Sequence, residues 1–122
     1  IANIIESNKI QTQWTANMLK SILDEKKLAG VILVGAAFKE DTDDLRNSPT
    51  VDIDNILKAE NINTMIYDDL IKSDEYLSIE DFENIEDPYL IALMYPVKEN
   101  LLTKINNIVS KTNSFLYTPW QI

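Results

Sequence analysis

The sequence predicts an α/β domain of three layers with a mainly parallel sheet, preceded by a long N-terminal helix. Short continuous apolar runs alternate with amphipathic segments, a pattern typical of βαβ units. The apolar runs show no polar alternation, which indicates strands covered on both faces, as parallel strands are. The 122 residues, of which 45% are hydrophobic and 25% charged, suffice for one ordinary core.

The first predicted element is a helix from Ala2 to about Lys26. This segment has no glycine or proline, and its apolar residues recur at spacings near four. Gly30 follows a pair of lysines in the manner of a helix stop. The apolar run 31–34 then predicts a buried strand, which Gly35 ends.

A polar loop separates this strand from the second predicted helix. Ser48 is placed to cap that helix and Pro49 to occupy its first position, while Asn61 can end it. The run 64–67 predicts the second strand. The acidic segment after it contains a short helical candidate at 79–82.

The last third of the chain predicts two more strands and a helix. A continuous apolar run predicts a strand over Tyr89–Tyr95, and Pro96 is expected to open a helix with one apolar side. A short strand over Phe115–Tyr117 follows. Strands that alternate with helices imply a parallel sheet with right-handed crossovers.

Composition excludes several classes of function. Twenty acidic residues against 11 basic ones give a net charge of -9, the wrong sign for a nucleic-acid partner. Because the chain has no cysteine or histidine, it cannot supply a thiolate nucleophile, an imidazole base, a Cys/His zinc site or a disulfide. No apolar run approaches the roughly 18 to 20 residues of a membrane span, so we expect no membrane partner.

Location and completeness are also expectations from the sequence. A chain without cysteine is compatible with the cytosol, so we expect a cytoplasmic protein. The first residue is Ile1 rather than methionine, which suggests a fragment of a longer protein or a processed chain.

The acidic run that begins at Asp41 does not fit a calcium loop, since Arg46 stands where that loop needs glycine. We therefore expect no metal site.

The loop after the first strand is the richest in chemistry. Ligands of open parallel sheets bind outside the carboxyl ends of the strands. Lys39 could place a point charge on a phosphate, Arg46 could make a bidentate contact, and free backbone amides near Ser48 could attract an anion. Alternatively, both cations pair with neighbouring carboxylates on a solvated loop, each pair contributing about 0 to 1 kcal/mol. The residues alone leave both interpretations open.

The stretch 31–49 carries a long, ordered pattern: an apolar strand, a glycine, Phe-Lys, an Asp-Asp pair, Arg, and Ser-Pro before a helix. It resembles the signature that opens the C-terminal, nucleotide-binding domain of the UDP-glucose/GDP-mannose dehydrogenase family. Tyr67-Asp68 resembles the end of that family's next strand, and Asn8 with Trp14 resembles the end of its long linker helix. The resemblance covers nearly the whole chain.

The resemblance implies a Rossmann-like domain with two parts. Residues 1–28 would form the end of the inter-domain linker helix, and residues 29–122 the nucleotide-sugar (UDP) binding C-terminal domain. Such enzymes use NAD to oxidise the C6 hydroxyl of a UDP-sugar to a carboxylate in two steps. Their NAD-binding glycines and catalytic cysteine lie in upstream NAD-binding and central domains of the same polypeptide. The resemblance therefore implies no catalytic residue in this chain, an inactive isolated fragment and a homo-oligomeric full-length enzyme.

Site residues are also carried over from the resemblance. Phe38 and Lys39 would line the nucleotide-sugar site, and Arg46 would reach across the cleft toward the NAD diphosphate. The tail 116–122 departs from the family, because it lacks the usual Asp and the Arg that helps to bind the nucleotide sugar. The Ser48-Pro49 form of the loop favours UDP-N-acetylhexosamines over UDP-glucose as substrates. The alternative function is a non-catalytic α/β nucleotide-binding or protein-interaction module.

Overall fold

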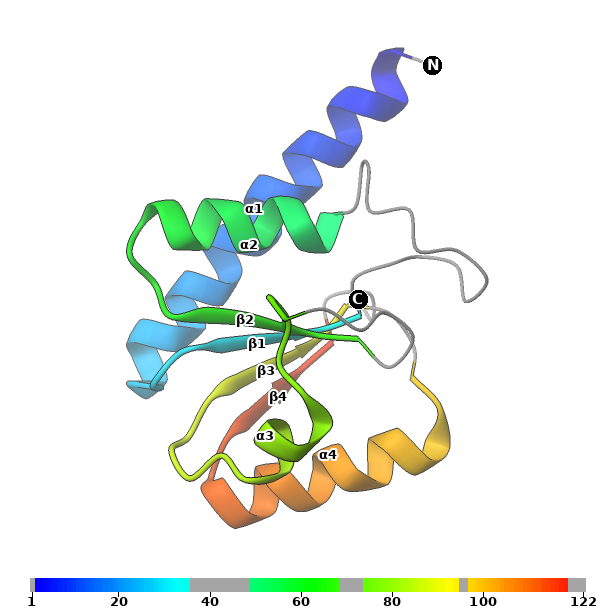
Figure 1. Ribbon diagram of the computed structural model, residues 1–122. Helices are drawn as coiled ribbons and strands as arrows, with labels where there is room; N and C mark the ends of the chain where they lie inside the picture. The colour runs from blue at the N-terminus through cyan, green and yellow to red at the C-terminus, as the bar shows by residue number, and fades with distance from the viewer. Residues whose placement is uncertain (1, 36–48, 69–73, 95–96, 119–122) are drawn as a thin grey trace.

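The computed structural model describes residues 2–35, 49–68, 74–94 and 97–118. Four helices and four strands alternate along these residues (Figure 1). In chain order they are α1 (Ala2–Lys26), β1 (Val31–Val34), α2 (Pro49–Ala59), β2 (Thr64–Tyr67), α3 (Ile79–Glu83), β3 (Leu90–Leu93), α4 (Glu99–Thr112) and β4 (Phe115–Tyr117).

The four strands form one parallel sheet in the order β2-β1-β3-β4. The register is even: Val31 of β1 lies beside Thr64 on one side and Leu90 on the other, and Leu90 in turn lies beside Phe115. The two central strands, β1 and β3, are buried along their whole length. The predicted α/β class and parallel sheet are therefore confirmed.

Helices cover both faces of the sheet, which gives the three predicted layers (Figure 1). Successive side chains of a strand point to opposite faces. Val31 and Leu33 accordingly belong to the core shared with α1 and α2, whereas Ile32 and Val34 belong to the core shared with α3 and α4. The second half of α1 contributes Ala16 to the first core with no exposed surface.

Residues in the left-handed conformation end three of the helical segments. Lys27 after α1, Asn61 after α2 and Asn113 after α4 have φ angles of 54°, 64° and 59°. The Asn113 amide donates to the Val109 carbonyl, which satisfies one of the free carbonyls in the last turn of α4. Asn61 ends its helix as predicted.

Two predicted boundaries were wrong. The third strand spans Leu90–Leu93 rather than Tyr89–Tyr95, and α4 begins at Glu99 rather than at Pro96. Lys98 has extended backbone angles and precedes the first helical residue. Val97 packs against the core beneath α3 and α4, and the helix begins only after this residue.

Candidate functional site at the carboxyl edge of the sheet

The carboxyl ends of β1 and β3 mark the point where the chain leaves adjacent strands in opposite directions. From β1 it continues to α2 on one face, and from β3 to α4 on the other (Figure 1). Ligands of open parallel sheets bind at such a switch point. Two backbone hydrogen bonds extend the strand pairing to this edge: Gly35 N donates to Tyr67 O at 2.8 Å, and Met94 N donates to Val34 O at 2.9 Å.

A partly buried hydrogen bond joins the two described ends of the loop between β1 and α2. Thr50, in the first turn of α2, donates its hydroxyl to the Gly35 carbonyl at 2.7 Å. Thr50 is completely buried, with 0% of its surface exposed. Gly35 has a φ of 102°, a conformation that L side chains rarely adopt. The loop therefore leaves and re-enters the body at a single fixed point on the carboxyl edge.

The predicted site residues Phe38, Lys39 and Arg46 belong to this loop and lie outside the described residues, as does Ser48. Their attachment points are nevertheless placed at the switch point by Gly35 and Thr50.

Acidic groups dominate the other side of the carboxyl edge, beyond β2. Asp68, directly after β2, is buried. Tyr76 is half-buried against the core under α1 and α2, and the next residue, Leu77, donates its amide to Ile66 O of β2 at 2.8 Å. Burial raises the pKa of Tyr76 above its ordinary value, and the negative charges of Asp68, Asp54 and Glu75 raise it further.

Asp54 is a buried carboxylate on α2, and it lies close enough to Tyr76 to raise the pKa of that residue. Its Oδ2 forms an ion pair with Lys58 Nζ at a distance of 3.0 Å. Only 9% of the Asp54 side chain is exposed. Its Oδ1 is buried and makes no hydrogen bond. The field on the β2 side is therefore negative, which disfavours a phosphate there. Within the described residues, the ends of β1 and β3 lie farther from these carboxylates than the end of β2 does.

Neither a metal nor a membrane is supported by the described part of the chain. No group of three or more Asp or Glu side chains within the four described ranges is arranged to hold a metal ion. Among the helices described, none combines the length and apolar character needed to cross a membrane.

Comparison with known proteins gives a family for this chain. Residues 32–112 match the UDP-glucose/GDP-mannose dehydrogenase family, UDP binding domain. The chain belongs to this family. The match includes all of β1 but its first residue, the whole loop that follows it, β3 and all of α4, so it spans both strands at the switch point. A comparison with curated proteins gives no match.

Two solved structures share the fold of this UDP-binding domain. They are the derivative and native structures of the UDP-N-acetyl-mannosamine dehydrogenase Cap5O from Staphylococcus aureus. Each has a TM-score of 0.63, with 21% and 20% sequence identity over 88% and 90% of this chain. The chain spans only 30% and 31% of the length of those two proteins.

The sequence did not single out Thr50 and Tyr76. A threonine one residue after Pro49 has no motif of its own, because its partner, the Gly35 carbonyl, is fifteen residues away. Tyr76 lies in the acidic segment that gave the weakest pattern. Asp54 was not singled out as a site residue either; it is buried and pairs with Lys58. The spacing of four between these two residues was the available signal.

Proposed function

We propose that this chain is the substrate-binding part of an NAD-dependent nucleotide-sugar 6-dehydrogenase and that it binds the UDP portion of the substrate. The family match over residues 32–112 carries this proposal, because it covers the switch point and its loop. The proposed reaction of the whole protein is oxidation of the sugar C6 hydroxyl to a carboxylate. A non-catalytic nucleotide-binding or interaction module remains the alternative outcome of the test below.

The roles of the loop residues follow from the charge of the ligand. A diphosphate carries two negative charges, and the β2 side of the edge is already acidic. Lys39 supplies a cation close to the end of β1, and Phe38 beside it offers an apolar surface to the nucleotide sugar. Arg46 lies near the start of α2 and reaches toward the NAD diphosphate. A guanidinium suits this role, because its planar fork can bind two phosphate oxygens at once.

The proposed substrate class is a UDP-N-acetylhexosamine rather than UDP-glucose. The Ser48-Pro49 form of the loop supports it, and so does the fold shared with a UDP-N-acetyl-mannosamine dehydrogenase. The tail 116–122 has neither of the usual family residues, Asp and Arg. In this protein the charge on the substrate is therefore balanced mainly by Lys39.

NAD supplies the hydride acceptor of the proposed reaction, but this chain does not fit its principal site. A dinucleotide loop needs several glycines, and the chain has only two, Gly30 and Gly35. Gly30 faces Asn63 so closely that a Cβ would lie 2.5 Å from the Asn63 carbonyl oxygen. It therefore serves packing at the amino edge of the sheet. Other parts of the longer protein bind NAD in this proposal.

Steady-state kinetics of the longer protein that contains this chain test the proposal. NADH formation should depend on a UDP-N-acetylhexosamine. Lys39→Ala should lower kcat/KM for the UDP-sugar by about tenfold or more, through loss of a charge-assisted contact. Arg46→Lys should raise the KM for NAD and leave that for the sugar nucleotide unchanged.

Lys20→Ala is the matched control, since Lys20 pairs with Glu60 on the surface, away from the loop. It should leave both KM values unchanged. Absence of NADH formation with every UDP-sugar tried, together with retained UDP binding, would favour the non-catalytic module. An unchanged kcat/KM in Lys39→Ala would show that this lysine is solvated instead.

A further inference from the structure

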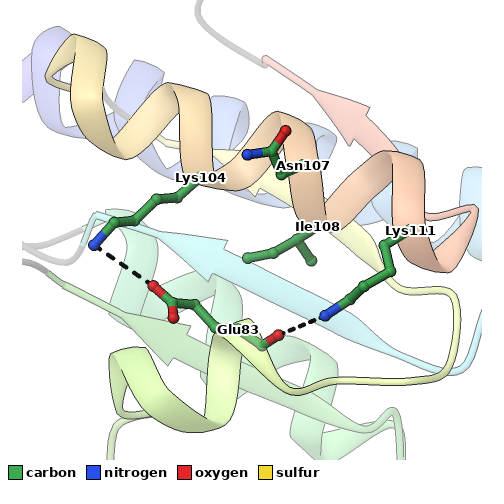
Figure 2. A pocket seen from close by; sticks show the side chains of 5 residues that line it. All are labelled: Glu83, Lys104, Asn107, Ile108 and Lys111. Atoms are coloured by element: carbon green, nitrogen blue, oxygen red, sulfur yellow. Dashed lines mark hydrogen bonds and ion pairs between the residues drawn. The ribbon is translucent and has the colours of Figure 1, made fainter.

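A second charged site lies between α3 and α4, apart from the carboxyl edge. It is a pocket of about 320 Å³ lined by Glu83, Lys104, Asn107, Ile108 and Lys111. Figure 2 shows the Lys104 and Lys111 side chains reaching from one helix toward Glu83, while the Asn107 side chain on the same helix points away from Glu83. The fourth α4 residue, Ile108, is buried and belongs to the core beneath the pocket.

The course of α4 separates this pocket from the proposed UDP site. The helix begins after the carboxyl end of β3 and ends just before the amino end of β4. Lys104 and Lys111 lie in its middle and last turns, beyond the first turn that follows the switch point. Glu83 ends α3, and the chain from there leads to the amino end of β3.

The pocket holds more hydrogen-bond donors than its own acceptors satisfy. Lys104 Nζ lies 3.5 Å from Glu83 Oε1, and Lys111 Nζ donates to the Glu83 backbone carbonyl at 2.8 Å (Figure 2). Each ammonium has three N–H donors. The Asn107 side chain makes no hydrogen bond to the described part of the chain and is exposed. Of the two ammonium groups, one therefore lies beside the Glu83 carboxylate and the other on the Glu83 backbone carbonyl, and each has donors to spare.

The charges that line this pocket differ in sign from that of the whole protein. The lining holds two lysines and one glutamate, so it carries one net positive charge, whereas the total charge of the chain is -9. Both lysines come from α4, while the opposite segment, residues 79–87, carries five acidic residues and no basic one. The positive charge is therefore confined to the lining, where it favours a small anion.

We propose that the pocket binds a small oxyanion, the phosphate or carboxylate group of a metabolite, between Lys104 and Lys111, with Asn107 at its rim. The volume lies at the lower end of the range for small-molecule pockets, about 300 to 1,000 Å³. Lys111 is held in place by its bond to the Glu83 backbone. The exposed pair between Lys104 and the Glu83 carboxylate is weak, so a ligand displaces that carboxylate at little cost.

Nuclear magnetic resonance of the 15N-labelled protein tests the proposal, because the Asn107 side-chain amide gives signals of its own. The probes are inorganic phosphate and malonate, each compared with sodium chloride at the same ionic strength. We expect a saturable shift of the Asn107 side-chain signals with at least one oxyanion and none with chloride. Phosphate alone, malonate alone or both would support the site and identify its preferred group.

Two substitutions, one that removes a positive charge from the pocket and one that removes a negative charge, should have opposite effects on binding. Lys104→Gln should weaken binding by about three- to tenfold. Glu83→Gln should strengthen it, since it removes the competing carboxylate and keeps the carbonyl that holds Lys111. Glu80→Gln and Lys98→Gln make the same changes in charge on α3 and before α4 without lining the pocket. They should change the affinity by much less.

Two results would overturn the proposal. One is no saturable shift of the Asn107 signals with either oxyanion. The other is an equal effect of the pocket variants and their matched controls, which would show general attraction of anions to a positive surface. Shifts near Gly35 upon addition of UDP report on the carboxyl edge instead, so failure of one site is distinguishable from failure of the other.

Discussion

Replacement of Thr50 by valine removes one hydroxyl from the base of the loop that carries the proposed ligand-binding residues. Thr50 is fully buried, and its hydroxyl lies 2.7 Å from the Gly35 carbonyl oxygen. Valine has nearly the same shape, so packing is retained. The Gly35 carbonyl loses this donor, and the two ends of the loop are no longer joined.

Because this hydrogen bond is partly buried, its loss costs about 0.5 to 1.5 kcal/mol of stability. For a domain of this size each kcal/mol corresponds to roughly 3 to 5 °C in melting temperature, so the expected decrease is about 2 to 8 °C. UDP binding should weaken as well, because the loop is then less well positioned above the switch point.

Urea unfolding and thermal unfolding measure the effect on stability. Thr103→Val is the matched control: Thr103 is exposed, and its hydroxyl donates to the Glu99 carbonyl at 3.0 Å. The free energy of unfolding of Thr103→Val should stay within about 0.5 kcal/mol of that of the parent protein. If Thr50→Val were as stable as Thr103→Val, the hydrogen bond to Gly35 would not hold the loop ends, and the reasoning would be refuted.

Three further predictions concern packing, pH and activity. Gly30→Ala should cost about 1 to 3 kcal/mol in urea unfolding, because the added Cβ would meet the Asn63 carbonyl, a backbone atom that also accepts from Val31 N at 2.8 Å; unchanged stability would contradict the close approach. The raised pKa of Tyr76 means that the folded state keeps its phenolic proton longer than the unfolded state, so its stabilising contribution is present below pH 10 and is lost as the pH rises through the folded-state pKa. In Tyr76→Phe the free energy of unfolding should fall less steeply as the pH rises through this pKa. An unchanged slope would contradict the prediction. The 122-residue chain alone should form no NADH from a UDP-sugar, since it has no thiol nucleophile and no dinucleotide loop; NADH formation by the purified chain would contradict this.

Sequence reasoning predicted the sheet because its strands are continuous apolar runs. The runs 31–34 and 64–67 have the bounds of β1 and β2, and left-handed Asn61 ends the second helical segment as expected. Such a signal is local, because a strand buried on both faces has few polar residues along its own length. The alternation of strands and helices also predicted the parallel pairing, whereas the strand order, and with it the switch point, came only from the structure.

The rest depends on contacts between residues far apart in the chain. The helix α4 begins only after Val97, which packs against the core under α3 and α4, and a proline in the same segment gave a misleading signal. The hydrogen bond between Thr50 and Gly35 forms only when these two residues, fifteen positions apart in the sequence, come into contact. The pocket between α3 and α4 arises only when Glu83 is packed opposite Lys104.

Titration of the 15N-labelled chain with UDP tests most directly whether this domain binds its ligand at the carboxyl edge. The account predicts saturable shifts of the Gly35, Asp68 and Met94 amides, with the amino-edge residues Gly30 and Asn113 unaffected. Lys39→Ala should reduce the affinity without moving these sites. The absence of saturable shifts, or the largest shifts at Gly30 and Asn113, would contradict it.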